Sequence, residues 1–265
     1  MHYNVFDRYR DGSSLLHRLA PTVKVVVAIL FILSNALLPD GDWLSFGISW
    51  GVILILNLLA KVGLGFTFKR SFIVLPFTLA AISALFSLPG ETLAIWDLGP
   101  WQLVATDLGL LRFLSIVVRS WLSVQIAILL VTTTQFPDLI HALEHLRLPR
   151  MLVTVIAFLY RYLFVLTDEV MRLLRARQAR SAVLPGQRGG GGILWRAQTA
   201  GNMVGQLFVR SYERSDRIYN AMLSRGYQGH MRTFNRHEIN ARDWLIMALS
   251  ILLLSFLQIT AHLQG

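Results

Sequence analysis

The 265-residue chain contains no cysteine and few charged residues. The absence of cysteine excludes a disulfide scaffold, cysteine-ligated zinc, iron–sulfur clusters and thiol catalysis. Asp, Glu, Lys and Arg make up 15% of the residues, whereas 54% are hydrophobic. A soluble domain has about 25% charged residues, so this chain has too few charges to cover a soluble globule of its size. The composition therefore indicates an integral membrane protein.

Acidic residues are also scarcer than basic ones, with 15 Asp+Glu against 25 Lys+Arg and a formal net charge of +10. In a soluble protein this imbalance would suggest nucleic-acid binding. In a membrane protein, basic residues instead collect on the cytoplasmic side. Residues 137–242 hold 16 of the 25 bases. Because the bases are concentrated in one segment, we expect contact with a lipid bilayer and with protein partners, and not with nucleic acid.

Five stretches lack charge and approach the roughly 20 residues that a bilayer span requires. They are residues 25–39, 43–60, 71–90, 120–137 and 244–261. Bases precede the first span and occupy the loop 61–70, whereas the loops 40–42 and 91–107 contain acids and no base. This alternation follows the positive-inside rule and predicts a cytoplasmic N-terminus. The N-terminus is polar to about Leu19, so we expect no cleavable signal peptide.

Acids are absent from all five spans, and the intramembrane bases are few. A protein that carried a metal cation by itself would be expected to have intramembrane carboxylates or histidines. Their absence suggests that substrate is recognised elsewhere. Arg112 and Arg119 precede or enter the fourth span from its outer end, and the deeper Arg119 needs an internal partner because burying a base is costly.

Residues 137–242 predict a helical region on the cytoplasmic side. A short amphipathic helix over 137–147 precedes a long helix over 151–183, whose first half, 151–166, is apolar but contains Arg161. Because bases flank that half on both sides, we expect it to lie against other helices near the inner leaflet. The glycine-rich stretch 185–192 reads as a linker, since it lacks the Lys-Ser or Lys-Thr of a phosphate-binding loop.

A second long helix is predicted over residues 194–224. Ala197, Gly201 and Gly205 form a small-residue line at four-residue spacing, which permits close approach of another helix. Apolar and polar side chains at three- and four-residue spacing predict one packed face: Val204, Leu207, Phe208, Tyr212, Ser215, Ile218, Tyr219 and Met222. We interpret the region as two long helices that pack on one another, each ending in a basic tip.

His141, Glu144 and His145 match the pattern H-x-x-E-H of inverted zinc metalloproteases. Two histidines four residues apart share a helix face, and the Glu beside them could act as a general base. A catalytic zinc needs a third protein ligand, which no neighbouring segment offers. The segment also reads as an ordinary amphipathic helix, which we favour, and an intramembrane metalloprotease is kept as an alternative.

Four segments resemble the transmembrane T component of energy-coupling factor (ECF) transporters, in its CbiQ-like branch. The opening, Asp7 followed by residues 16–24 (LHRLAPTVK), is similar to that family's opening, although Ala20 stands where an acid is common. Residues 136–149 resemble the short helix before the coupling region. Two short Ala-Arg-Gly-type motifs complete the resemblance: Ala179, Arg180 and Ser181, and Ser224, Arg225 and Gly226.

The resemblance implies an all-α integral membrane protein with about five transmembrane helices and two long crossing coupling helices. It divides the chain into membrane helices 1–4 (residues 1–135), a cytoplasmic coupling domain (136–242) and a last membrane helix (243–265). The implied location is the prokaryotic inner membrane.

The resemblance also implies partners: two ABC-type ATPase subunits, a CbiM-like substrate-binding S component and, in addition, a small accessory membrane subunit. Each arginine motif would enter a groove on an ATPase. The chain itself would be non-catalytic and without cofactors, since ATP and Mg would be bound by the ATPases. Cobalt is the implied cargo, followed by nickel or a vitamin. A self-sufficient secondary carrier is a further alternative, but no inverted repeat supports it.

Overall fold

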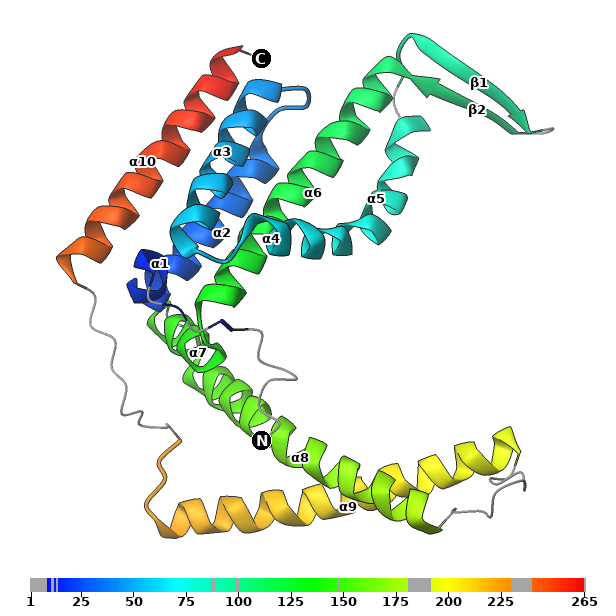
Figure 1. The fold of residues 1–265 in the computed structure, drawn as a ribbon, viewed down its shortest axis with the longest axis vertical. Coiled ribbons are helices and arrows are strands. Elements are labelled where there is room, and N and C mark those ends of the chain that lie inside the picture. The colour runs from blue at the N-terminus through cyan, green and yellow to red at the C-terminus, as the bar shows by residue number, and fades with distance from the viewer. Residues whose placement is uncertain are drawn as a thin grey trace. The chain divides into compact units, whose positions relative to one another are not determined.

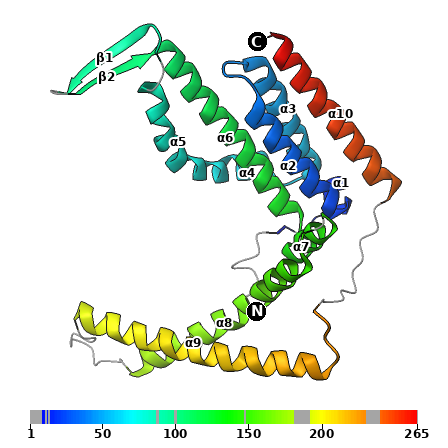
Figure 2. The same cartoon turned by 180° about the vertical axis from the view of Figure 1, so that it is seen from behind.

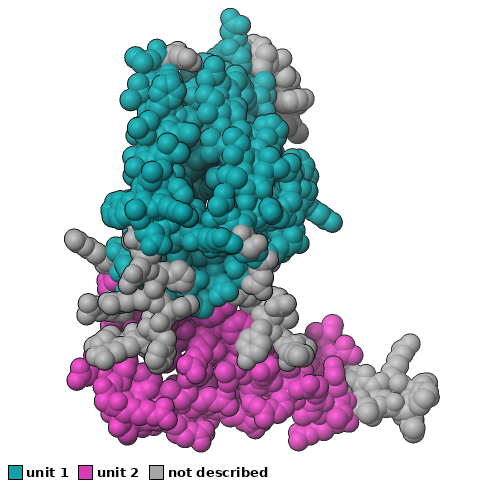
Figure 3. Space-filling model, turned by 60° about the vertical axis from the view of Figure 1, so that its left-hand side comes forward, with its two compact units in different colours: residues 1–146, 236–265 teal, residues 147–235 magenta. Residues whose placement is uncertain are grey.

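The computed structural model describes residues 9–10, 12, 14–86, 89–98, 101–146, 148–180, 192–229 and 240–264. The chain divides into two compact units, which Figure 3 shows in different colours. Unit 1 comprises Met1–Leu146 and Arg236–Gly265, and unit 2 comprises Arg147–Asn235. Ser181, most of the predicted linker 185–192 and the opening Asp7 lie outside the described residues.

Unit 1 is a bundle built around four long helices. These are α2 (Pro21–Leu37), α3 (Trp43–Ala60), α6 (Asp107–Thr133) and α10 (Ala241–Gln264). Both ribbon views show them side by side (Figures 1 and 2), and α2 packs against α6 and α10. The remaining helical elements are shorter: α1 (Leu15–Arg18), α4 (Leu64–Ser71), η1 (Phe72–Val74), α5 (Leu75–Ala81), η2 (Ile82–Phe86) and α7 (Phe136–His145).

The ends of these helices follow from local chemistry. Pro21 occupies the first turn of α2, where its missing N–H has no intrahelical partner to lose. The Asp42 carboxylate accepts from the Ser45 amide at the start of α3, and the Thr106 hydroxyl accepts from the Gly109 amide at the start of α6. Side-chain oxygens at these positions satisfy amides that the helix leaves unpaired. Consequently α6 begins well before the predicted span at residue 120, and Arg112 and Arg119 lie within it.

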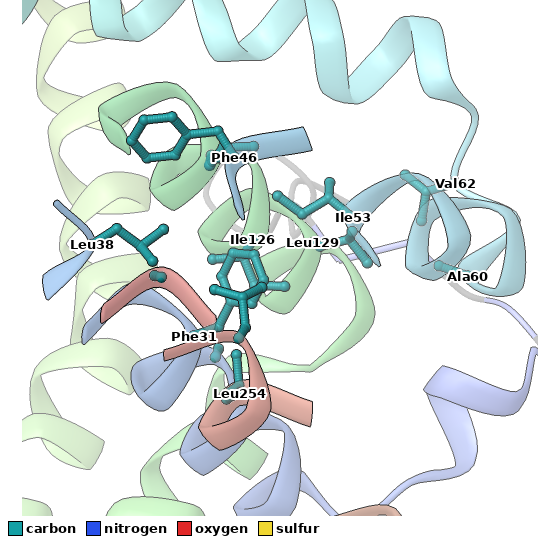
Figure 4. Close-up of a cluster of buried hydrophobic side chains, with 13 residues drawn as sticks. Phe31, Leu38, Phe46, Ile53, Ala60, Val62, Ile126, Leu129 and Leu254 are labelled. Atoms are coloured by element: carbon teal, nitrogen blue, oxygen red, sulfur yellow. The ribbon is translucent and has the colours of Figure 1, made fainter. Parts of the chain in front are cut away.

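The core of unit 1 lies where α2, α3, α6 and α10 meet. Figure 4 shows side chains from all four helices converging, among them Phe31, Ile53, Ile126 and Leu254. Along α3 the buried face repeats every four residues through Ser45, Ser49 and Ile53. Small polar residues on such a face allow helix backbones to approach closely, which stabilises membrane helices by packing because lipid supplies no hydrophobic driving force between them.

The third predicted span differs most from its prediction. It begins at Leu64 and consists of α4, η1, α5 and η2, with Pro76 in the first turn of α5. The polar junction near its start is satisfied internally, because the Thr67 hydroxyl donates to the Asn57 side-chain carbonyl at 2.6 Å. At its end, a Cβ on Gly109 of α6 would clash with the Leu85 carbonyl. Glycine at position 109 therefore permits this close approach.

The loop 91–107 contains a two-stranded antiparallel sheet that we did not predict. Strand β1 (Thr92–Leu98) pairs with β2 (Trp101–Thr106), with Leu98 opposite Trp101 and an irregularity between Thr92 and Ala94. Both strands contain the β-branched and aromatic residues that favour extended backbone. Apart from this hairpin, the described elements are helical.

Within the described residues, five helical segments are long and apolar enough to cross a membrane, which confirms the predicted fold class. They are Trp43–Ala60, Leu64–Phe86, Asp107–Thr133, Met151–Arg180 and Ala241–Leu263. The number equals the prediction but the members differ, because α2 has only 17 residues and α8 qualifies instead. That residues 151–166 lie against other helices near the inner leaflet and do not cross the bilayer stays a prediction.

Unit 2 consists of two long helices, α8 (Arg150–Arg180) and α9 (Ile193–Ser224), which cross (Figure 1). The predicted bounds, 151–183 and 194–224, agree closely with these. The sequence of α8 contains neither glycine nor proline. Both helices have more than 30 residues. Helices of this length can transmit a displacement from one end to the other without absorbing it in a loop.

Candidate coupling site

Arg180 is the last residue of α8, and its side chain is exposed. Arg177 lies in the same last turn. Basic side chains there are favoured by the partial negative charge that the helix dipole places at a C-terminus. Of the first predicted motif, Ala179 and Arg180 are thus described at a helix tip, whereas Ser181 lies outside the described residues.

Arg225 is the C-cap of α9, and the backbone around it is fixed by a specific hydrogen-bond pattern. The Gly226 amide donates to the Leu223 carbonyl at 2.9 Å, and the Tyr227 amide donates to the Met222 carbonyl at 3.0 Å. Gly226 has φ +79°, in the left-handed region that glycine adopts without steric cost. These bonds form a Schellman motif. The glycine of the second predicted motif therefore ends the helix directly after Arg225.

Arg180 and Arg225 have similar surroundings, each at the C-terminus of its own helix. Both are exposed, and within the part of the chain that the structure describes neither Arg180 nor Arg225 forms an ion pair. A guanidinium offers five donors in a rigid fork, which suits carboxylates and the carbonyl ends of helices. Arg225 also has the small neighbours Ser224 and Gly226, which leave its backbone uncrowded. Chemically, each tip can therefore insert a cation into an acceptor-lined groove of another protein.

The crossing of α8 and α9 is fixed by a carboxylate that sequence reasoning missed. Glu169 of α8 has a side chain only 7% exposed, and it accepts from Arg210 of α9 at 2.6 Å and from Arg172 at 2.5 Å. The hydrogen bond from Arg210, helped by the charge of Arg172, holds the pKa of Glu169 below its ordinary value. Glu169 lies beyond the apolar half of α8, in its charged half. The sequence signal that could have identified Glu169 was an acidic residue in a helix half whose other charged residues are mainly arginines.

The packed face of α9 was predicted only in part. Leu207, Ile218 and Met222 are half-buried as expected. In contrast, Val204, Phe208 and Tyr212 are 65%, 70% and 69% exposed, and Ser215 and Tyr219 are exposed as well, so that part of the prediction is wrong. The half-buried residues of α9 continue through Thr199, Met203, Ser211 and Arg214. The periodicity was correct, but the face was misplaced because α9 has apolar residues on two adjoining faces.

The small-residue line of α9 is open. Ala197, Gly201 and Gly205 are exposed, and no described atom lies within 4 Å of a Cβ added at either glycine. The contact between α8 and α9 includes Glu169 and Arg210 instead. The three residues thus lie on an exposed strip of α9, and their predicted part in a helix crossing stays a prediction.

The H-x-x-E-H segment forms α7. His141 Nδ1 lies 3.8 Å from Glu144 Oε2, and His145 Nδ1 shares a hydrogen bond with the His141 carbonyl at 2.9 Å. Among the described residues, no group of three or more His, Cys, Asp and Glu side chains is placed to hold a metal ion. The geometry therefore offers the zinc-protease alternative no third ligand from the described part of the chain.

Arg119 has the internal partners that its depth in α6 required. It donates to the Asp40 carboxylate at 2.8 Å and to the Leu38 carbonyl, both at the turn between α2 and α3. Arg112, two turns away on α6, lies 3.9 Å from the same carboxylate but is half exposed. Nearby, the Gly41 amide donates to the Ser115 hydroxyl at 3.0 Å. Arg119 thus fastens the N-terminal half of α6 to that turn.

These features define a class of protein: a multi-pass helical membrane protein that joins an apolar bundle to a pair of long charged helices with arginine tips. Comparison with known proteins agrees. A family model described as cobalt transport protein, CbiQ, matches residues 12–235. The chain belongs to this family, the CbiQ-like branch of the T components of ECF transporters.

Similar proteins cover nearly the whole chain. An uncharacterized protein of Methanocaldococcus jannaschii is 27% identical over 256 residues, which are 95% of this chain and 85% of that relative. The ECF transporter transmembrane protein EcfT of Lacticaseibacillus paracasei is 27% identical over 90% of this chain and 91% of its own length. EcfT of Streptococcus thermophilus is 28% identical, with 94% and 97% covered.

Proposed function

We propose that this T component couples ATP hydrolysis on two ABC-type ATPase subunits to movement of a substrate-binding S component in the membrane. The chain contributes no catalytic group and no cofactor, and the ATPases bind ATP and Mg. The single observation that carries the proposal is the exposed arginine at the tip of each long helix, which forms no ion pair with any residue that the structure describes. Relatives named as ECF transporter transmembrane proteins support it.

The proposed mechanism uses the stiffness of α8 and α9. Arg180 and Arg225, with Ala179, Ser181, Ser224 and Gly226 beside them, would each occupy an acceptor-lined groove on one ATPase. Charge-assisted hydrogen bonds are about twice as strong as neutral ones, so such a contact holds while the ATPases close. The ion pair between Glu169 and Arg210 keeps the two helices crossed during that movement. The displacement then reaches the S component through the helices.

The proposal requires a cytoplasmic N-terminus, with unit 2 on the same side of the prokaryotic plasma membrane as the ATPases. The alternation of basic and acidic loops supports this orientation. Cobalt is the proposed cargo, because the matching family is described as a cobalt transport protein, and nickel or a vitamin follows. We assign recognition of the cargo to the CbiM-like S component, with a small accessory membrane subunit beside it.

Charge reversal at the two tips tests the proposal. Arg180→Glu and Arg225→Glu should each reduce co-purification of the ATPases in mild detergent and reduce cobalt uptake by cells. Arg196→Glu is the matched control, because Arg196 is an exposed arginine near the other end of α9. Normal complex yield and uptake in both tip variants would contradict the proposal. Uptake by this chain alone in liposomes would instead support a secondary carrier.

A further inference from the structure

One carboxylate, that of Asp243, accepts hydrogen bonds from backbone amides at the N-termini of two helices of unit 1. Asp243 is 5% exposed in the first turn of α10, and its Oδ2 accepts from the Asn240 amide at 3.0 Å. Its Oδ1 accepts from the Ala20 amide at 3.2 Å. Ala20 is the N-cap of α2 and has no side chain that could cap the helix. Asp243 therefore acts as the acid of a capping box for α10 and also binds the N-cap residue of α2.

Lys24 lies one turn into α2, and its side chain forms a hydrogen bond to the C-terminus of a third helix, α6. Its ammonium donates to the Thr133 carbonyl at 3.0 Å and to the His17 carbonyl at 3.3 Å. Thr133 is the last residue of α6, where carbonyls lack intrahelical donors and a cation is favoured. Burial lowers the pKa of Lys24 to about 8, and the carboxylates of Asp138 in α7 and Asp243 in α10 offset part of this effect by favouring its positive charge.

These contacts make α2 the common support of the helices that lead to unit 2. In unit 1, α2 packs against α6, α7 and α10. Along the chain, α7 directly precedes unit 2, and α10 follows it. Movement of α8 and α9 can therefore pass along the chain into unit 1 through α7 or α10. Lys24 and Asp243 lie where the start of α10 and the junction of α6 and α7 are tied to α2.

We propose that Lys24 and Asp243 are positioning residues for energy coupling. They hold both chain connections of unit 2 to α2, so that displacement of the long helices moves the bundle as one body. Without them, α7 and α10 would shift locally and the ATPases would hydrolyse ATP with little transport. This inference rests on the coupling function proposed above.

The test uses the complete complex reconstituted in liposomes, with ATP hydrolysis and cobalt uptake measured together. The variants are Lys24→Met, which removes the ammonium, and Asp243→Asn, which replaces one of the two acceptor oxygens by a donor. Lys24→Arg tests rescue by another cation. Lys69→Met and Glu91→Gln are matched controls, because both side chains are exposed on unit 1.

We expect Lys24→Met and Asp243→Asn to lower the uptake per ATP hydrolysed by at least about five-fold, the lower range of a coupling effect. ATPase subunits should still co-purify, ATP should still be hydrolysed, Lys24→Arg should recover part of the loss, and the controls should match wild type. An unchanged ratio of uptake to hydrolysis in both variants would overturn the inference.

A second outcome would overturn it as well. If complex yield, hydrolysis and uptake all fell by the same factor, the two residues would serve stability alone. Failure of the proposed function has a different signature, since ATPases would then bind equally well to the wild type and to the Arg180→Glu and Arg225→Glu variants. The two failures are thus distinguishable in the same set of purified complexes.

Discussion

Glu169 of α8 accepts a hydrogen bond from Arg210 of α9 at 2.6 Å, and this pair joins the two long helices across 41 positions of sequence. The pKa of Glu169 lies below the ordinary carboxyl value of 4.5. The carboxylate therefore stabilises the crossing fully above that value, and the contribution disappears as the pH falls through the lowered pKa.

The crossing should accordingly be sensitive to acid. Because the chain has no cysteine, spin labels on the exposed positions Arg175→Cys and Gln206→Cys report the distance between α8 and α9 without background labelling. We expect one narrow distance distribution at pH 7 and a broad one once the pH falls below the lowered pKa of Glu169. Glu169→Gln should be broad at both pH values, whereas the exposed control Glu213→Gln should behave as wild type. A narrow distribution for Glu169→Gln at pH 7 would contradict this role.

Gly226→Ala should loosen the end of α9. A non-glycine residue in the left-handed region costs about 1–2 kcal/mol, and Gly226 has φ +79°. Because 1 kcal/mol corresponds to about a five-fold change in an equilibrium, the amides of Gly226 and Tyr227 should exchange hydrogen at least about five-fold faster. Gly192→Ala is the control, since Gly192 precedes the same helix with φ −55°. Equal exchange in both variants would show that no strain arises at Gly226.

Arg119→Met should destabilise unit 1 much more than Arg112→Met. The Arg119 side chain is 19% exposed and donates to Asp40 and Leu38, whereas Arg112 is 50% exposed and lies 3.9 Å from Asp40. Loss of hydrogen bonds to a charged group costs about 1.5–3 kcal/mol, while an exposed pair contributes about 0–1 kcal/mol. Thermal unfolding in detergent measures the difference. Similar unfolding midpoints for the two variants would be the contrary result.

Metal removal should leave the chain unchanged. His141, Glu144 and His145 lack a third protein ligand among the described residues, and three are usual for a catalytic zinc. Purified protein should contain no stoichiometric zinc, and chelation should not alter its thermal unfolding. Glu144→Gln should retain uptake. Stoichiometric zinc together with a proteolytic activity lost in Glu144→Gln would restore the metalloprotease alternative.

Much of the membrane bundle could be predicted from sequence, because absence of charge over about 20 residues is a local property. The end of α9 at Ser224 was predicted, whereas α2 begins at Pro21, four residues before the predicted span. The hairpin β1–β2 was missed because residues 91–107 were interpreted only as a connecting loop between two spans. The face of α9 that meets α8 was misplaced because periodicity identifies an apolar face but not which of two adjoining faces a partner covers.

The contacts that tie distant segments together were beyond sequence reasoning. Asp243 and Ala20 are 223 positions apart, and nothing local links them. The contact of Asp243 with Asn240 could nevertheless have been predicted, since these two residues have capping-box spacing. Its contact with Ala20 could not. For Arg119 the need for an internal partner could be predicted from the cost of burying a base, but its identity, Asp40, required the structure.

The central claim is that Arg180 and Arg225 contact the ATPase subunits, and site-specific photocrosslinking tests it most directly. A photoreactive side chain would be placed at position 180, at position 225 or, as a control, at position 196 in the complex assembled in membranes. We predict crosslinks to ATPase subunits from positions 180 and 225, with yields that change on ATP addition, and none from position 196. Crosslinks only to lipid or to other membrane subunits from both tips would contradict the claim.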